Sequence, residues 1–128
     1  MTRSRDRRLL IGQEVYRWRV IHRHVTGIDP RTGLGTAPCS EVLSLGREGS
    51  SGRVHIVFQG GPGLIVPDGY MHSGGVARSG VDGYLNLHKP GHVRAVLDTA
   101  LAEGAAFDRP VELDGWRLFD AALARLAP

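Results

Sequence analysis

Residues 14–25 read Glu-Val-Tyr-Arg-Trp-Arg-Val-Ile-His-Arg-His-Val, and the alternation of side chains in this stretch decides the fold. Successive side chains of a β-strand point to opposite faces of the sheet. The even positions carry Tyr16, Trp18, Val20, His22 and His24, whereas the odd positions are mostly arginine. The pattern predicts a strand whose aromatic face packs against another layer and whose arginine face lies on the outside.

The composition outside this stretch is typical of one globular domain. The chain has 128 residues, of which 41% are hydrophobic and 23% are charged, and these fractions are ordinary. Glycine is frequent, with 18 residues, about twice the usual share. We therefore expect many short strands joined by tight turns. The predicted organisation is a mobile basic arm at residues 1–8, followed by one domain at residues 9–128.

Several apolar runs between glycine-rich turns predict further strands. Besides 14–25, the predicted strands are 9–11, 41–45, 53–58, 64–66, 70–72, 76–78 and 84–87. The polar link at 47–52 is typical of an antiparallel hairpin. No helix is expected between strands before about residue 88, so parallel βαβ winding is not predicted.

After Pro90 the apolar residues fall at helical spacing. The stripes that they form are Val93, Val96, Leu97, Ala100 and Leu101, and then Trp116, Phe119, Leu123 and Leu126. Pro90 suits the first turn of a helix, Gly104 suits its end, and Asp114 can cap a second helix.

The order of these elements predicts an α+β fold. We expect an antiparallel sheet of about five to seven short strands, at residues 9–88, with two C-terminal helices packed on one face. Tyr16 and Trp18 would then pack against Trp116, Phe119 and the first helix.

The segment Pro90-Gly91-His92-Val93-Arg94-Ala95-Val96-Leu97, with Ala100 to Gly104, resembles a helix of small uncharacterised bacterial proteins. Those proteins also carry an N-terminal strand of the Tyr-Arg-Trp type, which here is Tyr16-Arg17-Trp18. The resemblance covers about half of the chain. It implies a bacterial source and no particular activity.

The sequence excludes several classes of enzyme. It contains no P-loop, no Gly-x-Gly-x-x-Gly fingerprint and no Gly-x-Ser-x-Gly elbow. Cys39 is the single cysteine, so the chain forms no internal disulfide. No apolar run reaches the length of a membrane span or of a signal-peptide core. We therefore expect a cytoplasmic protein without enzymatic activity.

The arginines predict a nucleic-acid partner. The net charge of +3 is uneven, because residues 1–25 contain seven arginines and two carboxylates. These arginines are Arg3, Arg5, Arg7 and Arg8 on the arm, and Arg17, Arg19 and Arg23 on the strand. Such an arm and strand face could contact phosphates, including DNA. The alternative is a solvated face whose arginines pair with carboxylates of the same chain.

Two further functions remain open from the sequence. His22 and His24 point the same way from one strand, as a partial ligand set for a divalent metal would require, and His55 could supply a third ligand. A metal-binding protein or metal-dependent enzyme is therefore the first alternative. The second alternative is a protein–protein interaction domain, and a homodimer is compatible with any of the three functions.

Overall fold

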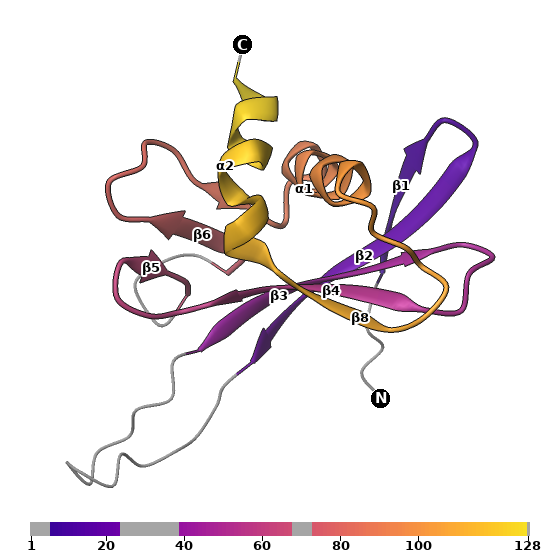
Figure 1. Cartoon of the computed structure of the whole chain (residues 1–128), viewed down its shortest axis with the longest axis horizontal. Helices are drawn as coiled ribbons and strands as arrows, with labels where there is room; N and C mark the ends of the chain where they lie inside the picture. Colours follow the sequence, from indigo (N-terminus) through magenta and orange to yellow (C-terminus); the bar gives the residue numbers. More distant parts are fainter. Residues whose placement is uncertain (1–5, 24–38, 68–72, 128) are drawn as a thin grey trace, which may run out of the picture.

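The computed structural model describes residues 6–23, 39–67 and 73–127, and within them the chain is an α+β domain (Figure 1). The predicted fold class is confirmed. The strands and helices are β1 (Arg7–Ile11), β2 (Glu14–Arg23), β3 (Ser40–Arg47), β4 (Arg53–Gln59), β5 (Leu64–Ile65), β6 (Gly75–Arg78), β7 (Leu85–Asn86), α1 (Pro90–Ala102), β8 (Val111–Asp114) and α2 (Gly115–Leu126). The predicted strand at 70–72 lies outside the described residues.

The main sheet has the order β1-β2-β3-β4-β8. Strands β1 to β4 form an antiparallel meander, in which Trp18 lies opposite Leu45 and Leu45 lies opposite Val54. Trp18, Leu45 and Val54 are all buried, which confirms that residues 14–25 begin as an extended strand with Trp18 inward. The first strand begins at Arg7, so Arg7 and Arg8 belong to β1 rather than to the predicted arm.

Strand β8 makes the sheet mixed, whereas the sequence predicts an antiparallel sheet. Residues 111–114, which belong to no predicted strand or helix apart from the cap at Asp114, pair in parallel with β4, with Val54 opposite Val111. The chain therefore crosses over through α1 between two parallel strands, which is a βαβ-type connection. The signal was the alternation of Val-Glu-Leu-Asp, with the glutamate and aspartate more exposed than their neighbours, but four residues are too few to distinguish a strand from a linker.

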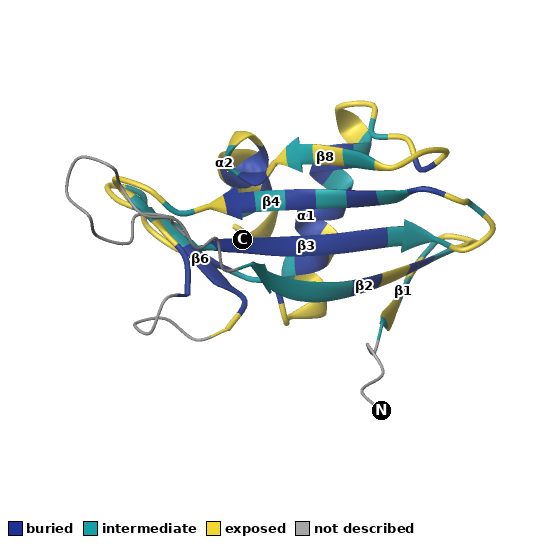
Figure 2. Cartoon of the chain, turned by 90° about the horizontal axis from the view of Figure 1, so that it is seen from below, coloured by how far each residue is buried: buried dark blue, intermediate teal, exposed yellow. Residues whose placement is uncertain are grey.

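Both helices pack on the same face of the main sheet, as predicted (Figures 1 and 2). The α1 helix begins at Pro90, and Gly104 follows its end with a φ of +92°, a value that suits glycine. The α2 helix is capped by Asp114, whose Oδ1 accepts a hydrogen bond from the backbone N–H of Trp116 over 3.0 Å. Asparagine, serine and aspartate are favoured at this position because they satisfy such an N–H group.

The aromatic contacts of the core differ from the expectation. The ring partner of Tyr16 is Phe107, at a centroid distance of 5.4 Å, and Phe107 lies in the connection between α1 and β8. Trp116 instead packs edge-on against Phe58 of β4, with centroids 5.2 Å apart. The expected pairing failed because α2 follows β8 directly and therefore starts beside β4, whereas Tyr16 lies two strands away.

A buried carboxylate connects the main sheet to a smaller sheet of order β5-β6-β7. The Glu41 side chain is fully buried on the helix-facing side of β3. Its Oε2 accepts a hydrogen bond from the backbone N–H of Gly74, just before β6, over 2.6 Å. Its Oε1 accepts from Nδ1 of His22 over 2.7 Å. A buried charge persists where such partners satisfy it.

The close contact between α2 and β4 gives a test of the fold. A Cβ atom added at Gly115 would lie 2.7 Å from the Phe58 ring, whereas one at Gly91 of α1 would meet nothing within 4 Å. We expect Gly115→Ala to lower the free energy of unfolding by about 1–3 kcal/mol, as overpacking does. Gly91→Ala, the control near the start of the other helix, should leave it unchanged or raise it by up to about 1 kcal/mol. Urea denaturation measures both, and equal effects would contradict this packing.

The role of Glu41 can be tested in the same way. Glu41→Ala leaves the Gly74 N–H without its acceptor, and an unsatisfied buried donor costs about 1–3 kcal/mol. Glu41→Gln should cost less, because the amide oxygen still accepts one hydrogen bond. Glu48→Ala, which removes an exposed partner of Arg17, should change the free energy of unfolding by less than about 1 kcal/mol. If the Glu41→Ala protein is as stable as the Glu48→Ala protein, Glu41 does not connect the two sheets.

Candidate nucleic-acid interface

One face of the main sheet is left uncovered by the helices. Figure 2 views the molecule from this side, with α1 and α2 behind the strands. We call it the open face. Strand register decides which residues it carries, because side chains alternate between the two faces. Trp18, Leu45 and Val54 face the helices, so their neighbours in sequence belong to the open face.

Guanidinium groups from three strands project from the open face. They belong to Arg8 of β1, to Arg17, Arg19 and Arg23 of β2, and to Arg53 of β4. Four of the five are among the residues predicted from the sequence. Arg53 was not, although its position next to the inward Val54 could have identified it. The structure thus brings together arginines that are far apart in the chain.

The other predicted arginines do not join this group. Arg7 lies opposite Trp18 and faces the helix side. Its guanidinium carbon lies 4.6 Å from the centroid of the Trp18 ring, and its Nη1 donates to the backbone oxygen of His88 over 2.6 Å. Arg7 therefore packs on the core. Arg3 and Arg5 lie outside the described residues, so their contribution stays a prediction.

Several open-face arginines form ion pairs. Arg17 pairs with Glu48 at 3.2 Å, Arg19 and Arg53 pair with Asp6 at 3.8 and 3.1 Å, and Arg23 pairs with Glu112 at 2.9 Å. All these side chains keep at least a fifth of their surface exposed. The pairs of Arg17 with Glu48 and of Arg23 with Glu112 are exposed and contribute at most about 1 kcal/mol each, so an incoming anion can replace these two carboxylates. Asp6, in contrast, is partly buried between Arg19 and Arg53.

The centre of the open face is packed, because Val42 lies between Ile21 and Val57 of the neighbouring strands. Ser44 and Val42 of β3 point to this side, yet both are fully buried. Arg53 donates from Nε to Oγ of Ser44 over 2.8 Å. Long arginine side chains can cover a sheet with their apolar stems while the charged group stays in water. The charged groups are consequently held by the sheet rather than by a loop.

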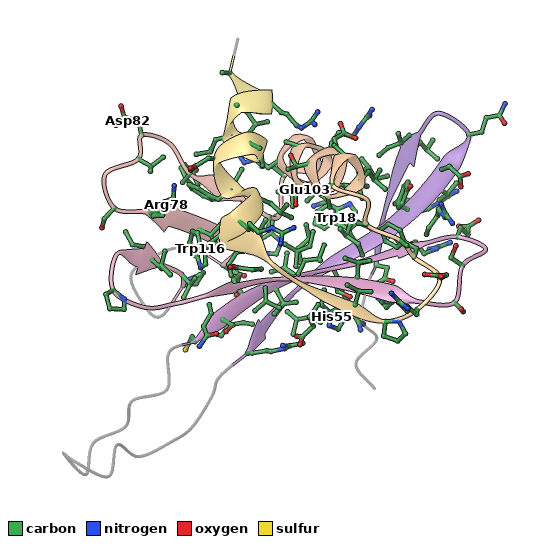
Figure 3. The ribbon with its side chains drawn as sticks, viewed as in Figure 1. Trp18, His55, Arg78, Asp82, Glu103 and Trp116 are labelled. Carbon is green, nitrogen blue, oxygen red and sulfur yellow. The ribbon has the colours of Figure 1, made fainter. Side chains whose placement is uncertain are left out.

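The structure places the predicted metal ligands apart. His22 lies on the helix side with Glu41, whereas His55 lies on the open face (Figure 3), where its Nδ1 is 3.2 Å from Nη2 of Arg23. His22 and His55 therefore cannot bind one ion. Among residues 6–23, 39–67 and 73–127, no group of three or more histidine, cysteine, aspartate or glutamate side chains is arranged to hold a metal. His24 lies outside those ranges, so its pairing with His22 stays a prediction.

The charged groups of the open face affect the pKa of His55. Partial burial lowers the pKa of His55 from its ordinary value of 6.5, and the positive charges of Arg23 and Arg53 lower it further. Glu112 acts in the opposite direction and only partly offsets these effects. The imidazole is therefore neutral at pH 7. Burial is the largest cause of this shift, and the neighbouring arginines add to it.

Comparison of the chain with protein-family models, with curated proteins and with solved structures finds no match in any of the three. The site must therefore be interpreted from its own geometry. None of the helices in the described part of the chain has the length and apolar character needed to cross a membrane.

The pKa of His55 can be checked directly. We expect NMR titration of its ring protons to give a value below 6.5, because the folded state disfavours the charged imidazole. The unfolded chain then binds more protons than the folded protein, so this residue reduces stability as the pH falls below about 6.5. The free energy of unfolding should drop more between pH 7 and pH 5 in the wild type than in His55→Gln. An equal drop in both would show that the folded protein does not lower the pKa of His55.

Proposed function

We propose that the protein binds nucleic acid on the open face of its main sheet, as a binding module and not as an enzyme. One observation carries the proposal. Arg8 and Arg17 lie directly opposite each other on neighbouring strands of this face, and both are exposed. Like charges at directly opposed positions destabilise a sheet. An anion that contacts both guanidinium groups would remove this repulsion.

The surrounding charges support a polymeric anion. Within the described residues Arg8 has no ion pair, and Arg17 has one carboxylate partner. Arg19, Arg53 and Arg23 continue the positive surface across β2 and β4. A phosphodiester chain presents repeated single charges, and arginine contacts them with more than one N–H group at a time. A cytoplasmic location, predicted from the single cysteine and the shortness of the apolar runs, would bring the protein into contact with such a partner.

An acidic protein surface is the competing partner, and a homodimer remains a prediction without a structural argument of its own. Nucleic acid is favoured because the guanidinium groups follow the strands in a row, as a phosphate backbone requires. Binding through phosphates also has a specific signature. The logarithm of the association constant falls linearly with the logarithm of the salt concentration, with a slope set by the number of phosphates contacted.

The matched experiment compares two double variants. Arg8→Gln with Arg17→Gln removes two charges from the open face. Arg94→Gln with Arg117→Gln removes two exposed arginines from the helices, where they pair with Asp98 and Glu103. Both variants lose the same net charge. Titration with a labelled oligonucleotide between about 50 and 200 mM salt should show weaker binding by the first variant and a salt slope shallower by about 2. The second variant should retain the wild-type slope.

Two results would overturn the proposal. One is a wild-type protein that binds neither single-stranded nor duplex DNA or RNA at about 50 mM salt, where electrostatic binding is strong. The other is an equal loss of binding in the two variants, since this would make net charge, and not the open face, responsible. Binding to an acidic protein without binding to oligonucleotides would assign the surface to the competing partner.

A further inference from the structure

A groove lies at one end of the open face, where β4 and β8 end and α2 begins. Its volume is about 710 Å³, within the range of small-molecule sites. Its lining includes Arg23, Gln59, Glu112, Asp114 and Trp116. They come from β2, β4, β8 and α2. The groove therefore forms only when residues of the first quarter of the chain lie beside residues of the last quarter.

Trp116 gives one wall of the groove a fixed aromatic surface (Figure 3). Its indole Nε1 donates to the backbone oxygen of Gln59 over 2.8 Å. The rings of Phe58 and Phe119 contact the same indole at centroid distances of 5.2 and 5.3 Å. The indole is thus held on its inner side while part of its surface remains exposed. An aromatic ring fixed in this way is a stacking platform for a planar ligand.

The charge of the groove decides which part of a nucleic acid can enter it. Arg23 contributes one positive charge, but Glu112 and Asp114 contribute two carboxylates. A phosphate is less favoured there than beside Arg8 and Arg17, because the groove has two carboxylates for its single arginine. Carboxylates accept hydrogen bonds from the amino groups of bases, and cytosine N4 is the best-defined example. The groove therefore suits a base, and the arginine row suits the backbone attached to it.

We propose that this groove receives an unpaired, amino-bearing base, so that the preferred partner is single-stranded nucleic acid. The inference rests on the proposed function, because the phosphate backbone of the bound nucleic acid would lie on the open face. The base would stack on Trp116 and donate its amino hydrogens to Glu112 or Asp114. A base within a duplex cannot reach the indole, because its faces are covered by its neighbours.

The experiment uses the wild-type protein and three probes of equal length, about 12 nucleotides: oligocytidine, an abasic strand and a duplex. The abasic strand keeps the phosphates and lacks the bases. We expect oligocytidine to bind about 5- to 150-fold more tightly than the abasic strand, the range that one stacked base provides. The duplex, in which no base face is free to stack on Trp116, should bind less tightly than oligocytidine.

Fluorescence locates the contact. The chain has two tryptophans, and Trp18 is buried in the core. Oligocytidine should quench the wild-type emission, whereas Trp116→Phe, which retains a ring against Phe58 and Phe119, should lose most of this quenching. Glu112→Gln removes one carboxylate and should reduce the preference for oligocytidine over oligothymidine.

The outcomes separate this inference from the proposed function. If oligocytidine and the abasic strand bind with equal affinity and the salt slope is that of the open face, the groove does not receive a base and the proposed function stands. Quenching that is unchanged in Trp116→Phe leads to the same conclusion. If no probe binds at about 50 mM salt, the proposed function and this inference both fail.

Discussion

Because both helices pack on one face of the five-stranded sheet, the side chains of the other face must themselves shield its central strand from water. The helices bury the aromatic and aliphatic side chains of β2, β3 and β4. The opposite side of the same strands receives no layer from the described residues, yet β3 in its centre is buried on both sides. Side chains of the neighbouring strands resolve this conflict. Val42 lies between Ile21 of β2 and Val57 of β4. Ser44 lies between Arg19 and His55 and accepts a hydrogen bond from Nε of Arg53. The basic surface is therefore also part of the packing of the sheet.

Much of the architecture could be predicted from local patterns. The alternation around Trp18 identified β2 and its orientation, and the helical spacing after Pro90 identified both helices and their caps. These signals lie within a few residues of one another, so no knowledge of the fold is needed to detect them. Strand β8 was missed for the converse reason. Its four residues are defined by pairing with β4, and nothing in Val111 to Asp114 by itself reveals that partner.

The candidate site was predictable only in part. Alternation assigned Arg17, Arg19 and Arg23 to one face, and the register confirms that assignment. It could not show that Arg7 turns to Trp18, because the boundary between arm and strand was set two residues too late. It also could not show that Glu41 is buried, since a glutamate next to apolar residues usually marks an exposed position. The groove beside Trp116 was beyond reach, because its walls come from segments that meet only through the crossover to β8.

That crossover also affects when the protein can become functional. Strand β4 cannot pair with its parallel neighbour β8 until the intervening strands and the whole of α1 have been synthesised. Pairings between strands so far apart in the sequence form slowly. The groove needs Arg23 from the first quarter of the chain together with the last helix. A nascent polypeptide could thus display the arginines of β1 and β2 early, but it would acquire the stacking wall only near the end of translation. If the protein binds nucleic acid as proposed, selectivity among nucleic acids would arise later than attraction to them.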